Sequence, residues 1–289
     1  MNSIALFKQY VTLLDEVYKN ASLTSVLDGA SDLARQGANA NELIIPKMTL
    51  DGLADYSRNS GYVDGDVTIA NETVTCNFDR GRMFTVDNLD NAESAGIAFG
   101  RLAGEFIRTK VVPELDAFRF ATYASISGIS AADAAALSTG AAVVAAIRAA
   151  VNKLNEDEVP LEGRYLFITP TLYGLIQDLD TTKSKDVLSG LTVVQVPQTR
   201  FYTAITQNDG TTDGQKGGGY TKAADAKNIN FMLIQKEAVI QFEKHVAPKV
   251  ITPEANQSGD AWKFGYRNVG IADAYENKVA GIYLHNSTT

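Results

Sequence analysis

The sequence predicts an α+β fold with two long helical regions and a separate group of short buried strands. Apolar residues recur at three- and four-residue spacing within residues 90–124 and 139–155, which predicts amphipathic helices. Short apolar runs at 165–168, 191–196 and 229–234 are typical of buried strands. With 289 residues, 45% of them hydrophobic, the chain can bury a sizeable core.

Composition excludes several classes of protein. The net charge of −8 argues against a dedicated nucleic-acid binder, which needs a basic face. Cys76 is the only cysteine, so the chain has no intrachain disulfide and no cysteine-based metal site. Residues 1–20 mix charges with apolar positions, unlike a signal peptide, and no apolar run reaches the roughly 20 residues of a membrane span. We expect a protein that is made and kept in a cytoplasm, or in a particle assembled there.

The N-terminal region combines a helix with an arm. The apolar residues of 1–20 form one stripe at helical spacing, which must be buried somewhere. Residues 20–42 are rich in Ala, Asn, Ser and Gly, which is typical of an extended arm. Residues 43–48 then predict the start of a strand.

Residues 51–79 are strongly acidic, with Arg58 as their one basic residue. Apolar and polar residues alternate on both sides of residues 70–72, which predicts a long two-stranded hairpin with its turn there. An isolated hairpin is only marginally stable in water. We therefore expect it to lie on another surface that carries arginines or lysines.

A long helix is predicted after this hairpin. Asp90 followed by Glu93 matches a capping box, and the negative charge of both favours a helix N-terminus. Pro113 should break or kink the helix and begin a second one. Beyond 139–155, strands alternate with a helix at 170–179, and two strand-like stretches at 238–251 and 280–285 follow.

Candidate chemical groups have simpler structural explanations. His245 and His285 each lie in a strand pattern, and we expect both to be satisfied or surface residues. The G-x-S-x-G nucleophile motif is absent. Turn chemistry accounts for Asp64-Gly-Asp66, and helix capping accounts for Asp87, Asp90 and Glu93 without a metal ion. Cys76 is expected to be a small buried residue.

The glycine-rich stretch 208–225 does not match a nucleotide-binding motif. Gly217, Gly218 and Gly219 have neither the P-loop nor the dinucleotide-binding spacing, so a flexible surface loop is expected. Arg80 and Arg82 flank Gly81 at the base of the acidic hairpin and suit either bidentate pairing with carboxylates or simple solvation. Because the hairpin is so acidic, we expect that pairing to involve a neighbouring chain.

The order of these parts resembles the major capsid (coat) proteins of tailed bacteriophages, which have the Hong Kong 97-type fold. The most specific motifs are Asp79-Arg80-Gly81-Arg82 with Asp87-Asn88 and Glu93, then Val112-Pro113-Glu114-Leu115-Asp116, then Glu276-Asn277-Lys278 with Gly281-Ile282-Tyr283. The resemblance runs over nearly the whole chain. It implies an extended arm, an E-loop hairpin that lies over a neighbour, a P-domain with a spine helix, and an axial α/β A-domain.

By this resemblance, the chain divides into an arm (1–45), the E-loop hairpin with its flanking strands (46–88), the spine helix and P-domain (89–136), the A-domain with its loop 208–225 (137–237), and the P-domain return with the C-terminal strand (238–289). The expected inter-subunit contacts are Asp64, Asp66, Glu72, Arg80, Arg82, Arg101, Arg108, Lys110 and Arg119. Gly217, Gly218 and Gly219 are expected at the capsomer axis, where their tolerance would fit two ring sizes.

The implied function is a shell of hexamers and pentamers that encloses double-stranded DNA, in a virion assembled in the cytoplasm of a bacterial host. The implied partners are other copies of the chain, a portal protein and decoration proteins, with no sequence-specific DNA binding, no cofactor and no catalysed reaction. The arm begins within a few residues of Met1, so we expect a separate scaffolding protein. Residues 51–79 contain no lysine, so we expect noncovalent contacts alone between subunits. The alternatives are an encapsulin-like compartment and an α/β enzyme or ligand-binding protein that uses the loop.

Overall fold

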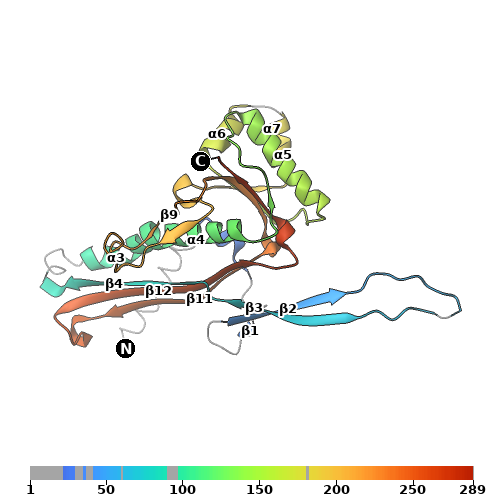
Figure 1. The fold of residues 1–289 in the computed structure, drawn as a ribbon. Helices are drawn as coiled ribbons and strands as arrows, with labels where there is room; N and C mark the ends of the chain where they lie inside the picture. Colours follow the sequence, from blue (N-terminus) through green and yellow to red (C-terminus); the bar gives the residue numbers. More distant parts are fainter. Residues whose placement is uncertain are drawn as a thin grey trace.

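The computed structural model describes residues 22–29, 35–36, 42–59, 61–89, 97–179 and 182–288. The helix expected in 1–20 and the capping box of Asp90 and Glu93 lie outside the described residues. In Figure 1 a long helical segment runs between two sheets, and a hairpin projects from one end of the molecule. Within the described residues, no helix has both the length and the apolar character that a membrane crossing requires.

One sheet is long and antiparallel. Its order is β11 (Val239–Ile251), β12 (Ala261–Ala274) and β4 (Phe78–Asp87), with β12 in the centre. Residues 262–275, an aromatic-rich stretch between the strand-like stretches expected at 238–251 and 280–285, thus form most of the central strand. Gly81 of β4 is required by close packing, because a Cβ atom there would lie 2.9 Å from the carbonyl oxygen of Tyr266.

The long helical segment covers one face of this sheet. It consists of α3 (Ile97–Phe106), a π-helical turn (Ile107–Val111) and α4 (Val112–Ser125). Pro113 was expected to break or kink the helix and begin a second one; α4 does begin at Val112, with Pro113 in its first turn, but the chain stays helical through the π-turn before it. Proline at the start of α4 has no N–H group and crowds the carbonyl one turn earlier. A wider π-turn immediately before it relieves that conflict.

The second sheet has five strands in the order β5-β13-β10-β6-β7. These are β5 (Ser130–Ala131), β13 (Ile282–Asn286), β10 (Ile229–Gln235), β6 (Arg164–Ile168) and β7 (Thr192–Gln195). β10 is antiparallel to both of its neighbours, and β13 with β5 and β6 with β7 are parallel pairs. The mixture of long antiparallel and short mixed sheets confirms the α+β fold class.

Helices cover both faces of the five-stranded sheet. On one face lie α5 (Gly140–Glu156), α6 (Pro170–Gln177) and α7 (Thr182–Leu188), and a shared apolar core joins α5 residues such as Ile147 to Leu166 of β6. On the other face, α4 contributes Phe120 and Tyr123 to a second core. Shorter elements are η1 (Ser25–Leu27), η4 (Gln198–Arg200), β8 (Ile205–Gln207), β9 (Tyr220–Lys222), η5 (Lys236–Ala238), η6 (Pro253–Ala255) and η7 (Val279–Gly281).

The projecting hairpin is formed by β2 (Glu42–Leu50) and β3 (Val67–Thr75), while β1 (Arg35–Gln36) pairs with β2 at the base. The turn predicted at residues 70–72 is wrong, because these residues pair with residues 45–47 inside the ladder. All of β3 pairs with β2, whereas a turn at 70–72 would split β3 and leave only a short pair of strands. The chain instead reverses within residues 51–66, where its glycines and aspartates lie.

Arg119 corrects a second expectation. It was expected on a basic surface that receives a neighbouring chain, but it is only 1% exposed. Its guanidinium donates to the hydroxyl of Thr24 (2.9 Å) and lies 3.4 Å from the Glu243 carboxylate and 3.6 Å from that of Asp28. These partners come from the arm and from β11. Arg119 therefore fastens the arm to the body of its own chain.

Asp116 of α4 anchors the same stretch of arm. Its fully buried carboxylate accepts hydrogen bonds from the hydroxyls of Ser22 (2.8 Å) and Thr24 (2.7 Å) and from Arg200 (3.2 Å). Ser22 and Thr24 are buried with it and Arg200 is partly buried, so all three donors would lose their acceptor if the carboxylate were removed.

We predict that Asp116→Ala destabilises the unassembled chain by about 3–5 kcal/mol, because it leaves buried donors and a cation without their acceptor. Urea unfolding followed by circular dichroism measures this difference. Asp133→Ala removes an exposed aspartate and should change the free energy of unfolding by no more than about 0.5 kcal/mol. Equal stabilities of the two variants would show that the buried network contributes nothing.

Candidate inter-subunit surface

The projecting hairpin carries a cluster of large apolar side chains exposed to solvent. Leu53 and Tyr62 are the most exposed, and the rings of Tyr56 and Tyr62 form an edge-to-face pair with centroids 4.9 Å apart. Contiguous exposed apolar side chains mark interaction sites in soluble proteins. We call this set the hairpin patch; its members are Met48, Leu50, Leu53, Tyr56, Tyr62, Val63, Val67 and Ile69.

Acidic groups lie among these apolar residues. Asp64 and Asp66 are exposed, as the sequence predicts. A carboxylate oxygen of Asp51 accepts a hydrogen bond from the backbone N–H of Asp66 (2.8 Å) and so closes the loop between β2 and β3. Glu72 pairs with Ile45 through the backbone, and its side chain lies outside the described residues. The hairpin thus presents apolar and acidic groups together.

The expected basic strip on the long helix is smaller than predicted. Arg108 is exposed, but its Nη2 donates to both carboxylate oxygens of Glu105 on the same helical turn (2.8 and 2.9 Å). Lys110 is exposed in the π-turn. The side chain of Arg101 is outside the described residues, and Arg119 is interior. Docking of the hairpin on Arg108 and Lys110 stays a prediction.

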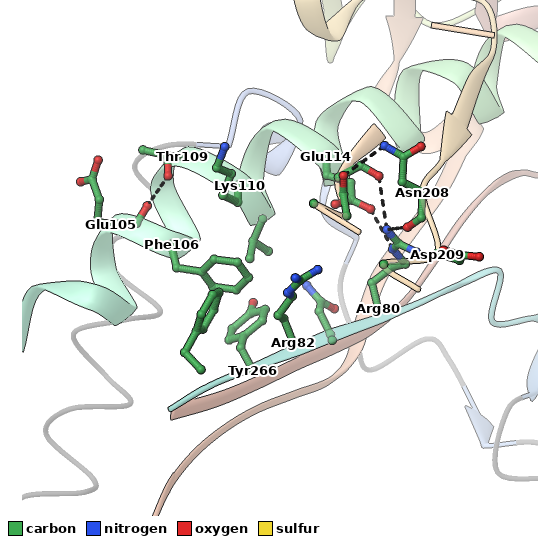
Figure 2. Close-up of a pocket in the computed structure, with 18 of the residues that line it drawn as sticks. Arg80, Arg82, Glu105, Phe106, Thr109, Lys110, Glu114, Asn208, Asp209 and Tyr266 are labelled. Carbon is green, nitrogen blue, oxygen red and sulfur yellow. Dashed lines mark hydrogen bonds and ion pairs between the residues drawn. The ribbon is translucent and has the colours of Figure 1, made fainter. Parts of the chain in front are cut away.

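Arg80 was expected to pair with a neighbouring chain, but it pairs within its own chain. Its Nε atom donates to a carboxylate oxygen of Glu114 in α4 (2.8 Å), and Nη2 donates to the carbonyls of Asn208 (2.7 Å) and Gly219 (3.3 Å), as Figure 2 shows for the first two. Burial raises the pKa of Glu114, and the Arg80 charge opposes that rise. Arg80 therefore joins β4, α4 and the glycine-rich loop.

The glycine-rich loop lies between β8 and β9 and rests on β4 of its own chain. Nη2 of Arg82 donates to the carbonyl of Lys216 (3.0 Å). Gly218 and Gly219 have positive φ angles of 66° and 75°, and a Cβ atom on Gly218 would lie 2.9 Å from Nη1 of Arg82. Gly217 faces open space. The loop thus rests on β4 of its own chain, and its place at a capsomer axis stays a prediction.

Asp209 orders the start of this loop. Its carboxylate accepts hydrogen bonds from the backbone N–H groups of Thr211 (2.7 Å) and Thr212 (2.9 Å), and from the Thr212 hydroxyl. The Thr212 hydroxyl first, and then the two backbone donors, lower the pKa of Asp209 to about 2.

A groove of about 680 Å³ runs between α3 with its π-turn, strands β4 and β12, and the glycine-rich loop. In Figure 2 the ring of Phe106 points from the helix toward Tyr266 of β12, and the side chain of Arg82 extends from β4 beside them. The rings of Phe84 and Phe106 have centroids 4.8 Å apart, and those of Phe106 and Tyr266 are 6.2 Å apart. Sequence reasoning missed this groove, because its walls come from four separate segments of the chain.

Among the described residues, the other candidate groups form no recognisable site. His285 is buried, its Nδ1 lies 3.1 Å from Nδ2 of Asn230, and burial lowers its pKa, as expected of a satisfied core histidine. The side chain of His245 lies outside the described residues. Cys76 is half-buried against Val74 and Ile271. In the part of the chain that the structure describes, no three metal-ligating side chains gather.

Neither a protein-family model nor a curated protein sequence matches this chain. Solved structures do. A structure of Gordonia phage Cozz aligns with a TM-score of 0.61 at 11% identity, covering 93% of this chain and 87% of the other. The capsid structure of cyanophage P-SCSP1u gives 0.56 at 12% identity over 88% and 86%. A virus-like particle from Pyrococcus furiosus gives 0.58 at 11% identity over 95% and 96%.

These similarities define the fold. Over most of its length the chain has the Hong Kong 97-type fold found in phage capsid structures, as the sequence resemblance predicts. At identities of 11–14% the likeness concerns the fold alone.

We predict that Thr212→Val raises the pKa of Asp209 from about 2 toward its ordinary value of 3.8, because the largest contribution to the lowered pKa is lost. Carboxyl chemical shifts followed by NMR between pH 1.5 and 6 would measure both values. Because the folded-state pKa is depressed, the ordering effect of Asp209 is present above pH 4 and declines as the pH falls toward 2. Thr211→Val is the matched control: it keeps both backbone donors and the Thr212 hydroxyl and removes only the weakest contribution, that of the Thr211 side chain, so it should raise the pKa less than Thr212→Val does. A pKa unchanged by Thr212→Val would contradict this account of the loop.

Proposed function

We propose that this chain is the major capsid protein of a tailed bacteriophage or prophage. Copies of it assemble into hexamers and pentamers, and these close into an icosahedral shell around packaged double-stranded DNA. The chain catalyses no reaction, and it functions by assembling with other copies of itself. The observation that carries the proposal is the hairpin patch, an apolar surface on a projecting element of a chain whose fold recurs in phage capsids.

The shape of the molecule supports contacts between copies. The hairpin extends from one end of the body, and the long sheet with its helix extends toward the other (Figure 1). A contact in which one end of a copy lies on the body of the next is heterologous, and such contacts build rings when the rotation closes. Burial of Leu53, Tyr62 and the rest of the hairpin patch supplies the driving force.

Charge sets the orientation of that contact. Asp64, Asp66 and Glu72 of the hairpin face basic groups of the adjacent copy, with Arg101, Arg108 and Lys110 as the candidates on the helix. Complementary charges of this kind steer association and fix its register, while apolar burial supplies most of the affinity. The contacts in this proposal are noncovalent: residues 51–79 contain no lysine, and β2 and β3 together carry one, Lys47.

The proposal includes the partners of a phage head. These are other copies of the chain, a separate scaffolding protein, a portal protein at one vertex, and decoration proteins. The shell forms in the cytoplasm of the bacterial host and becomes part of the virion. Its DNA is enclosed without sequence-specific contacts, which agrees with a net charge of −8.

A second candidate function has one specific observation in its favour. The virus-like particle from Pyrococcus furiosus covers 95% of this chain, and this chain covers 96% of it in return. An encapsulin-like shell that holds a protein cargo would use the same hairpin contacts. The contents of purified particles distinguish the two, since a phage head holds DNA and a compartment holds protein.

We predict that shortening the hairpin abolishes the shell and leaves the subunit folded. Replacing residues 49–68 with Asn-Gly joins Met48 to Ile69, which are already paired across the hairpin, through a turn suited to that geometry. Electron microscopy should show particles for the parent chain and none for the variant. Size-exclusion chromatography and circular dichroism should show that the variant is a folded monomer.

The control is Leu161→Ser, which removes an exposed leucine elsewhere on the molecule and should leave assembly intact. Tyr62→Ser with Val63→Ser tests the patch without shortening the chain, and it should weaken assembly. Normal particles from the shortened variant would refute the role of the hairpin.

A further inference from the structure

The groove beneath the π-turn has the size and lining of a small-molecule site. Its volume of about 680 Å³ lies within the range of roughly 300–1,000 Å³ typical of ligand pockets. Three walls enclose it: the helix with its π-turn, the sheet strands β4 and β12, and the glycine-rich loop. Arg80 holds the loop in place through two carbonyls, so this wall belongs to the folded structure.

The floor of the groove is apolar and aromatic. Phe106 contacts Phe84 on one side and Tyr266 on the other, and Leu102 and Val111 extend the same lining along the helix. Aromatic faces held at fixed positions accept an aliphatic chain or a flat ring with little loss of their own conformational freedom. The body of a ligand for this groove would therefore be apolar.

The charge left over in the groove is positive. Glu114 pairs with Arg80 and Glu105 pairs with Arg108, whereas Asp209 keeps its negative charge, because its partners are neutral donors of its own loop. Arg82 and Lys110 therefore exceed Asp209 by one positive charge. Arg82 places its guanidinium between the loop and Tyr266, and one of its nitrogens is used by the Lys216 carbonyl. Lys110 adds a second cation at the rim. An anionic group on the ligand would compensate these charges.

Asn268 gives an independent indication of a ligand. It lines the groove from β12 and is 1% exposed. Within the described residues, neither its amide nitrogen nor its amide oxygen has a hydrogen-bond partner. Buried polar groups are nearly always paired in native proteins, and an exception calls for an ordered water or a ligand.

We propose that this groove binds a small amphipathic carboxylate. The aliphatic or aromatic body lies on Phe84, Phe106 and Tyr266, and the carboxylate accepts hydrogen bonds from the free nitrogens of Arg82. The amide of Asn268 donates to the ligand directly or through one ordered water. The enclosure on three sides selects a small molecule over a protein segment. This site does not depend on the proposed shell function, because it lies within a single chain.

Isothermal titration calorimetry of the unassembled chain at pH 7 tests the site, with octanoate as the probe. One octanoate per chain should bind, and octylammonium, which has the same body and the opposite charge, should bind at least tenfold more weakly. Arg82→Gln should weaken octanoate binding about five- to tenfold, because a charged donor is lost while the hydrogen bond to Lys216 can be kept. Arg82→Lys should recover most of the affinity, and Asn268→Leu should lower it.

Two controls locate the site. Arg148→Gln removes an exposed arginine of α5 and should leave octanoate binding unchanged. Tyr62→Ser with Val63→Ser, which alters the hairpin patch, should also leave it unchanged. Absence of binding, equal binding of octanoate and octylammonium, or loss of binding in the hairpin variant would each overturn the proposal. None of these binding results bears on whether particles form, and particle formation tests the proposed function separately.

Discussion

The packing of α4 is the constraint on which the rest of the molecule depends. Val112 and Leu115 belong to the core beneath the long sheet, while Phe120 and Tyr123 belong to the core of the five-stranded sheet. One helix thus completes two hydrophobic cores, and neither sheet can shift without disturbing it. The buried polar groups of the same helix also fix the end of the arm. The body behaves as one unit from which the hairpin projects.

The hairpin follows a different physical rule. The body buries most of its large apolar side chains, whereas the hairpin patch leaves them in water. A two-stranded hairpin gains little stability by itself, so this element needs a surface that its own chain does not provide. Its acidic residues keep the free chain soluble and select a basic partner. The same sequence can therefore fold as a monomer and remain ready to assemble.

Local patterns predicted local structure well. The helix expected at 139–155 is found as Gly140–Glu156, and the strands expected at 165–168 and 229–234 are both present, because periodicity reports which face of an element is buried. The turn at 70–72 failed because strand pairing depends on a partner more than twenty residues away along the chain, and β2 offered a longer ladder. Motif resemblance identified the fold, although no family model matches.

Site residues were harder to predict, because charge in a sequence does not report burial. Arg80 and Arg82 were singled out correctly as special, but their partners are Glu114 and the glycine-rich loop of the same chain. Arg119 looked like a surface cation and is buried among the carboxylates of Asp28 and Glu243. Ion pairs between residues more than thirty positions apart leave no spacing signal in a single sequence.

The central claim is that another copy of the chain covers the hairpin patch. Hydrogen–deuterium exchange of the amides in β2 and β3 tests it directly, by comparing the unassembled chain with purified particles. The outer residues around Met48 to Leu50 and Val67 to Ile69 should exchange rapidly in the free chain and at least about tenfold more slowly in particles, because burial adds to the local opening free energy. Equal exchange in both states would show that the hairpin stays exposed and would contradict the account.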